Sequence, residues 1–152
     1  MSVMFKQRIL ALMLVLLPLL SSCSAVFDPA LTELAVKDFH NSYNASSFTT
    51  IYRNSSPEFQ EFVSEDKFTR LLGKLQTKLG EHHSSDLVSW SSKSSFGGAT
   101  MVTLVYKAEY QHDGQAQESF TFRVRDGLAR LYNFNVSSPV LSQKNRSRET
   151  EI

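Results

Sequence analysis

The sequence predicts an α+β domain in which N-terminal helices pack on a four-stranded antiparallel curved sheet. Apolar residues recur every three or four positions as far as Gly80, which is the spacing of amphipathic helices. Beyond Gly80 apolar and polar residues alternate, as in strands that bury one face. The pairs Asp113-Gly114 and Asp126-Gly127 favour tight hairpin turns between the later strands. Helices are therefore expected to precede an antiparallel meander.

The first predicted helix starts at Ala30 and continues for about four turns. Its apolar face is expected to comprise Leu31, Leu34, Ala35, Phe39 and Tyr43. The pattern continues past Ser46-Ser47 through Phe48, Ile51 and Tyr52, so we expect a kink or a second helical piece there.

Two more helix starts follow. Ser56-Pro57-Glu58 combines an N-cap hydroxyl, a proline at the first helical position and an acid in the first turn. Ser64-Glu65-Asp66 begins the clearest amphipathic helix, which Gly80 ends. The side chains expected to be buried are Phe59, Phe62 and Val63 in the short helix, and Phe68, Leu71, Leu72, Leu75 and Leu79 in the long one.

Four strands are predicted in the second half of the chain. The first, over 87–93, is weakly patterned around Trp90, whereas 100–111 and 115–125 alternate strongly. The expected inward residues are Val102, Leu104, Tyr106 and Tyr110, then Phe120, Phe122 and Val124. Leu128, Arg130, Tyr132, Phe134 and Val136 are expected to share one face of the last strand.

The N-terminus has the order of an export signal. Lys6 and Arg8 precede an apolar run over 9–20, which is shorter than the roughly 20 residues of a membrane span. The segment Leu20-Ser21-Ser22-Cys23 resembles the lipobox of bacterial lipoproteins, with an aliphatic residue and two small ones before a cysteine. Cys23 is the only cysteine, and a lone thiol is otherwise unexpected in an exported chain.

The lipobox resemblance implies that residues 1–22 are a signal peptide and that Cys23 carries diacylglycerol and a further acyl chain such as palmitate. Residues 23–29 would then be a tether. Ser24, rather than an aspartate, follows the cysteine, which favours the periplasmic face of the outer membrane over the inner membrane. The alternative is cleavage after Ala25, which would leave a secreted soluble protein. Four Asn-X-Ser triplets, at Asn44, Asn54, Asn135 and Asn145, would support a eukaryotic secretory protein instead.

Composition narrows the class of protein. Removing the first 22 of 152 residues leaves 130, enough for one domain. Lys6 and Arg8 are removed with the signal peptide, so the mature chain has 14 basic and 15 acidic side chains. A net charge this close to zero gives no reason to expect nucleic acid as a partner. Residues 139–152 are mostly polar and are predicted to be a disordered tail after the domain at 30–138.

Within 30–138 the chain resembles the NTF2-like, or cystatin-like, α+β cone. The resemblance lies in Ala35, Phe39, Tyr43, Phe48, Ile51 and Tyr52, in Ser56-Pro57-Glu58-Phe59, and in the closing segment 127–134. More narrowly, the chain is similar to small bacterial lipoproteins that place such a domain behind a lipobox. The resemblance implies an apolar pocket inside the cone and a sheet face that makes dimers or binds an envelope protein. The pocket candidates are Phe39, Tyr43, Tyr52, Tyr106 and Phe122.

Catalysis is the alternative function. Some proteins of this fold are isomerases or dehydratases that use an Asp and a His or Tyr inside the cone, but Asp38 and His40 are two apart on a helix and cannot both face one pocket. His82-His83 with Asp86 lacks the spacing of a zinc site and is expected in a solvated loop.

We therefore predict a non-enzymatic binding domain without metal or cofactor. A pocket holding two or more buried titratable groups would favour the enzyme. A third class of function is a structural role in the envelope through self-association. Arg123, Arg125 and Arg130 on neighbouring strands are the one hint of a protein-binding patch.

Overall fold

A computed structural model describes residues 29–94 and 98–142. Over these ranges the elements are α2 (Ala30–Asn44), α3 (Phe48–Arg53), α4 (Pro57–Phe62), α5 (Glu65–Leu79), β1 (His82–Ser94), β2 (Thr100–Tyr110), β3 (Asp113–Arg125) and β4 (Leu128–Ser137). The sheet has the order β1-β2-β3-β4 with every pair antiparallel. The predicted fold class, helices followed by a four-stranded antiparallel curved sheet, is confirmed.

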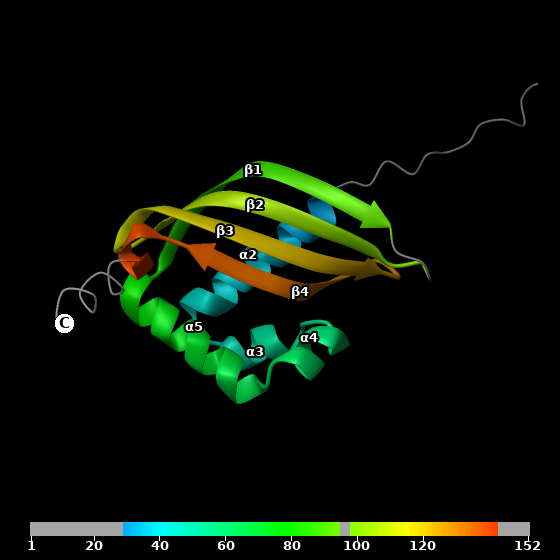
Figure 1. The fold of residues 1–152 in the computed structure, drawn as a ribbon, viewed down its shortest axis with the longest axis horizontal. Helices are drawn as coiled ribbons and strands as arrows, with labels where there is room; N and C mark the ends of the chain where they lie inside the picture. The colour runs from blue at the N-terminus through cyan, green and yellow to red at the C-terminus, as the bar shows by residue number, and fades with distance from the viewer. Residues whose placement is uncertain (1–28, 95–97, 143–152) are drawn as a thin grey trace, which may run out of the picture.

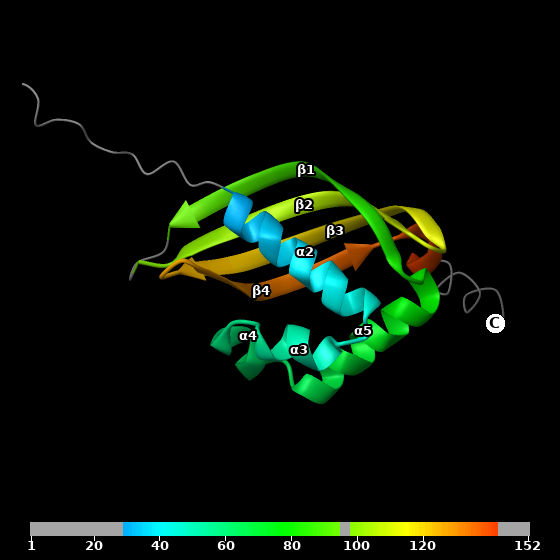
Figure 2. The ribbon, with the colours of Figure 1, turned by 180° about the vertical axis from the view of Figure 1, so that it is seen from behind.

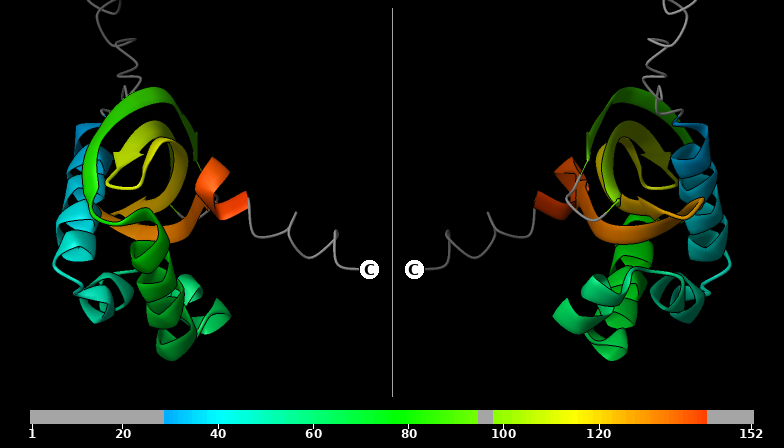
Figure 3. Two further views of the ribbon diagram at one scale, coloured as in Figure 1. Left: turned by 90° about the vertical axis from the view of Figure 1, so that its left-hand side faces the viewer. Right: turned by 90° about the vertical axis from the view of Figure 1, so that its right-hand side faces the viewer.

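The sheet curls and α2 lies across its concave side (Figures 1 and 2). Viewed from the end, the strands form an open ring that α2 flanks (Figure 3). α2 contacts both edge strands, β1 and β4, and therefore bridges the two ends of the curl. The helices α3, α4 and α5 lie together beyond β4 (Figure 2), with α3 against α5 and α4 against β4.

The core fills the space between the helices and the concave face of the sheet. Its most enclosed large side chains come from α2, α5, β2 and β3, and are Tyr43, Leu72, Leu79, Val102, Leu104, Phe120 and Glu118. Burial of each large apolar side chain contributes about 1.5–3 kcal/mol. Glu118 is the exception in this set, because a carboxylate without solvent contact needs hydrogen-bond donors.

Three predictions of buried helical residues are wrong. Leu34 is 60% exposed, Leu71 is 48% exposed and Phe62 is 93% exposed. On α2 the buried residues are Thr32, Val36, Phe39, His40 and Tyr43, a stripe rotated away from Leu34. For Leu34 the reason is that α2 packs between two sheet edges, so its buried face includes polar positions that an apolar pattern does not mark.

The predicted start of α4 is confirmed. Ser56 is the N-cap, and its Oγ accepts a hydrogen bond from the Phe59 N–H at 3.2 Å, with Pro57 in the first turn. The Ser56 N–H donates to the Leu131 carbonyl at 2.8 Å. This bond joins the start of α4 to β4, so the same residue caps the helix and positions it.

The strands differ from the prediction in one turn and in the start of β1. β1 starts at His82, five residues earlier than expected. The turn between β2 and β3 is Gln111-His112 rather than Asp113-Gly114, because the buried Asp113 side chain accepts hydrogen bonds from Ser138 Oγ and from the Gln115 N–H. The Asp126-Gly127 turn is confirmed, with φ of 52° and 72°.

A β-bulge divides β4. Thr121 pairs with Asn133, but the next residue, Phe122, pairs with Leu131, so Tyr132 is left unpaired. The inward-facing positions of β4 therefore change from odd to even residue numbers at the bulge. Leu131 is buried before the bulge, and Phe134 packs against the core after it. The prediction that one face of β4 holds 128, 130, 132, 134 and 136 is wrong.

The ordered chain continues past the predicted end of the domain. Residues 139–142 form a helical turn, although a disordered tail was predicted from 139. Val140 and Leu141 pack against the core, and Ser138 Oγ ties this turn to Asp113. The rest of the predicted tail lies outside the described residues.

Within 29–94 and 98–142, no helix has the length and apolar character needed to cross a bilayer.

Gly80 lies between α5 and β1 in a backbone conformation with positive φ, and its replacement is expected to destabilise the fold. Its φ of 77° and ψ of −158° are accessible almost only to glycine, and an added Cβ would lie 2.6 Å from the Gln111 side chain. Gly80→Ala is expected to lower the free energy of unfolding by about 2–4 kcal/mol, combining backbone strain and overpacking. Urea denaturation measures this difference.

Gly73 provides the matched control. It lies inside α5, where an added Cβ would be 3.7 Å from Phe48 Cε2, an ordinary contact. Gly73→Ala is therefore expected to raise stability by about 0.5–1 kcal/mol. Equal effects of the two substitutions would contradict the proposed strain at Gly80.

Candidate functional site

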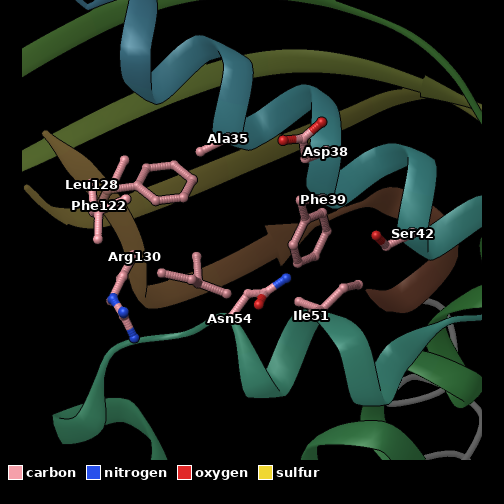
Figure 4. Close-up of a pocket in the computed structure, with 11 residues that line it drawn as sticks. Ala35, Asp38, Phe39, Ser42, Ile51, Asn54, Phe122, Leu128 and Arg130 are labelled. Atoms are coloured by element: carbon pink, nitrogen blue, oxygen red, sulfur yellow. The ribbon is translucent and has the colours of Figure 1, made fainter.

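Two cavities lie against α2. The first, which we name the α2–β4 cavity, has a volume of about 300 Å³ and lies between α2, α3 and β4. Figure 4 shows Phe39 of α2 and Ile51 of α3 facing each other in it. Its apolar lining is Ala35, Phe39, Ile51, Phe122, Leu128, Ala129 and Leu131, and its polar lining is Asp38, Ser42, Asn54 and Arg130.

The second, the α2–β1 cavity, lies where α2 meets the other edge of the sheet and has a volume of about 370 Å³. Its lining is mostly polar and consists of Glu33, Val36, Lys37, His40, Asn41, Asn44, His82, His83, Ser85 and Tyr106. The two cavities share no lining residue, so α2 separates an apolar site from a polar one.

The sequence-predicted pocket residues do not gather in one place. Phe39 and Phe122 line the α2–β4 cavity, and Tyr106 lines the α2–β1 cavity. Tyr43 and Tyr52 line neither: the Tyr43 hydroxyl donates to the Gly80 carbonyl at 3.2 Å, and the Tyr52 hydroxyl donates to the Val63 carbonyl at 3.0 Å. Cys23 lies outside the described residues.

Asp38 and His40 face different cavities, as their spacing predicts. Asp38 is at the α2–β4 cavity and His40 at the α2–β1 cavity, so the two do not form a catalytic pair. The basic residues of the sheet are neighbours, because Arg123 of β3 pairs with Arg130 of β4 and Arg125 lies two residues further along β3. Arg123 also forms an ion pair with Glu58, Arg125 lies 3.6 Å from Asp126, and Arg130 lines the α2–β4 cavity. Their use as a protein-binding patch stays a prediction.

Beside the α2–β1 cavity lies a group of buried polar residues that the sequence reasoning did not assemble. Glu118 of β3 has no solvent exposure. His40 Nε2 lies 3.0 Å from Glu118 Oε2 and 3.2 Å from Oε1, and the Tyr110 hydroxyl donates to Oε1. With His82, these residues are named the Glu118 cluster. Two donors thus satisfy a carboxylate inside an aromatic core.

His82 completes the cluster, and the prediction that it lies in a solvated loop is wrong. Asn44 at the end of α2 makes two 2.8 Å hydrogen bonds with the backbone of His82: its Oδ1 accepts from the His82 N–H, and its Nδ2 donates to the His82 carbonyl. A register shift just after His82 leaves His83 without a partner on β2. These bonds and this bulge set His82 against α2 while His83 is exposed.

The His82 ring stacks on His40, with centroids 3.5 Å apart and an interplanar angle of 5°. Its Nε2 is buried and has no hydrogen-bond partner among the described residues. Burial, together with the nearby His40, lowers the pKa of His82 to about 4, although Glu118 acts in the opposite direction. His82 is therefore a neutral imidazole near pH 7.

The tyrosines of the site stay protonated. Burial, followed by the charge and hydrogen bond of Glu118, raises the pKa of Tyr110 far above its usual range. Burial also raises the pKa of Tyr106 to about 12, with contributions from Glu33 and Glu118. Tyr110 therefore acts as a permanent donor to Glu118. Chemically, the cluster offers a buried carboxylate and imidazole nitrogens beside a polar cavity.

Comparisons with known proteins leave the family of this chain open. No family model matches it, and no curated protein matches it. One similar solved structure is that of a protein from Kribbella flavida DSM 17836, described as a "known function protein". It is 16% identical, covers 81% of this chain and 99% of its own, and has a TM-score of 0.47.

Proposed function

We propose that this protein is a lipoprotein anchored through Cys23 to the periplasmic face of the outer membrane, whose NTF2-like domain binds a small ligand in the α2–β4 cavity. The observation that carries the binding proposal is the cavity itself. Its volume of about 300 Å³ and its apolar walls with a few polar groups are typical of small-molecule sites. The lipobox resemblance supports the anchor.

The lining indicates which ligands fit. Seven of its residues are apolar, and they include Phe39, Ile51 and Phe122 from three different elements. Asp38 and Arg130 supply opposite charges, and both side chains are solvent-accessible. A small, largely apolar molecule with one polar head group would bury its body against the aromatic residues and place its head near these charges.

Two fluorescent probes with the same rings test this assignment: 1-anilinonaphthalene-8-sulfonate and uncharged 1-anilinonaphthalene. Ala35→Phe adds a ring to the cavity wall and is expected to abolish binding of both. Arg130→Gln is expected to weaken only the sulfonate, by about 2–5-fold, because an exposed charge pair contributes at most about 1 kcal/mol. Probe fluorescence during titration of the full chain in detergent measures both effects.

Leu34→Phe is the matched control, since Leu34 is on the same helix, 60% exposed, and not part of the cavity lining. It is expected to leave both affinities unchanged. Binding that survives Ala35→Phe, or that falls equally with Leu34→Phe, would contradict the assignment. Thermal melting of each variant separates a filled cavity from a misfolded chain.

A second candidate function is favoured by the Glu118 cluster. The α2–β1 cavity has the titratable groups His40 and His82 in its wall, with Glu118 directly behind them. That arrangement is a criterion for an enzyme of the isomerase or dehydratase type.

A protein partner or homodimer is proposed at β1, where Leu87, Val88 and Trp90 are 38%, 65% and 43% exposed.

A further inference from the structure

The Glu118 cluster brings three metal-ligating side chains together from distant parts of the chain. His40 comes from α2, His82 from β1 and Glu118 from β3. Their ligand atoms all lie within 4.8 Å of one another. Because these residues are far apart in sequence, no spacing motif marks the site, and only the curl of the sheet against α2 assembles it.

We propose that His40, His82 and Glu118 form a binding site for a divalent transition-metal ion, with Zn²⁺ as the best-matched species. Two imidazoles and one carboxylate are a donor set that binds zinc and leaves a further coordination position open. The site is independent of the ligand proposed for the α2–β4 cavity, since the two cavities share no lining residue.

The separations between the ligand atoms suit a shared ion. Two ligands held about 2.0–2.2 Å from a tetrahedral zinc ion lie roughly 3.3–3.5 Å from each other. His40 Nε2 is 3.0 Å and 3.2 Å from the two Glu118 oxygens, only slightly less. A movement of a few tenths of an ångström would therefore admit an ion between these two groups.

His82 is the residue that an ion would explain. Its Nε2 is buried without a hydrogen-bond partner in the described chain, and a buried nitrogen left in this state costs about 1–3 kcal/mol. In the stacked arrangement the two ring planes are nearly parallel, so one ring must tilt before both lone pairs meet at one ion. His40 Nε2 must also release to solvent the proton that it donates to Glu118, because a metal-bound imidazole nitrogen carries no proton. His82 is the ring that can tilt, because its Nε2 has no hydrogen-bond partner in the described chain, whereas His40 Nε2 is bonded to Glu118.

The surroundings supply orientation and access. The Tyr110 hydroxyl donates to Glu118 and holds the carboxylate in place, as second-sphere donors do in metal sites. His40 and His82 line the α2–β1 cavity, which gives an ion a route from solvent. The open coordination position would face this cavity, whose lining includes Lys37 and Tyr106.

Titration of the full chain in detergent with Co²⁺, followed by displacement with Zn²⁺, tests the site. We expect one Co²⁺ per chain, with visible d–d bands of a low-coordinate nitrogen and oxygen site, and a higher melting temperature in the presence of Zn²⁺. His82→Ala is expected to weaken Zn²⁺ binding by more than about 100-fold. Tyr110→Phe, which removes only a second-sphere donor, is expected to weaken it by about 10–100-fold.

His83→Ala and His112→Ala are the controls, because both histidines are exposed neighbours of the site. Both variants are expected to bind Co²⁺ as the unmodified chain does. Absence of d–d bands, a thiolate charge-transfer band from Cys23, or loss of binding in His83→Ala would each overturn the proposal. His82 is only partly buried, so its variant should fold, and circular dichroism checks this.

Discussion

Replacing Glu118 with alanine is expected to lower the free energy of unfolding by about 3–5 kcal/mol, which combines the cost of two buried polar groups left without a partner with that of a cavity. The Glu118 side chain is fully enclosed and accepts hydrogen bonds from Tyr110 and His40. Its removal leaves those two groups buried without partners and leaves a cavity in an aromatic core. Urea denaturation in the presence of a chelator measures the loss without any contribution from bound metal.

Two further variants make this prediction specific. Glu118→Gln keeps the shape of the side chain and one acceptor oxygen, so a smaller loss of about 1–3 kcal/mol is expected, and this variant remains measurable if the alanine chain does not fold. Glu109→Ala removes an exposed carboxylate from β2 and is expected to change stability by less than about 0.5 kcal/mol. Similar losses at positions 118 and 109 would show that the buried hydrogen bonds contribute little.

The second large effect is expected at Cys23. Cys23→Ser removes the thiol that would carry diacylglycerol, so the chain should change from fully membrane-bound to either an uncut precursor or a soluble product. The change is close to all-or-none because two or three acyl chains make attachment effectively permanent, whereas none makes it negligible. Fractionation of cells, together with the intact mass of the extracted protein, measures it.

A variant of the neighbouring residue tests the destination separately. If Ser24 directs the protein to the outer membrane, Ser24→Asp should retain the lipidated chain in the inner membrane without altering its mass beyond the substitution. An unmodified N-terminus after Ala25, or glycans on the asparagines, would refute lipidation at Cys23 and indicate a secreted protein.

Much of the architecture could be predicted because local patterns and the final packing agree. The N-cap at Ser56, the end of α5 at Gly80 and the Asp126-Gly127 turn each depend on a few adjacent residues. The errors occur where contacts between distant elements decide. β1 begins with polar residues that show no alternation, and it is a strand there because β2 pairs with it and Asn44 binds His82.

The Glu118 cluster was less accessible to sequence reasoning. One signal was present. Glu118 lies two positions before Phe120 and four before Phe122, and alternation along a strand puts all three side chains on the inward face of β3. Periodicity shows that such a residue is buried, but it cannot name the donors that satisfy it. His40 is 78 positions away, and no local pattern connects the two.

The sequence by itself determined the order of helices and strands, most of the core, and the lipobox hypothesis, because each follows from neighbouring residues. Only the tertiary structure decided that α2 bridges both edges of the curled sheet, leaving an apolar cavity at β4 and a polar one at β1. Sheet curvature and the β4 bulge set which side chains from distant segments meet. The position of each site is therefore a property of the packed fold.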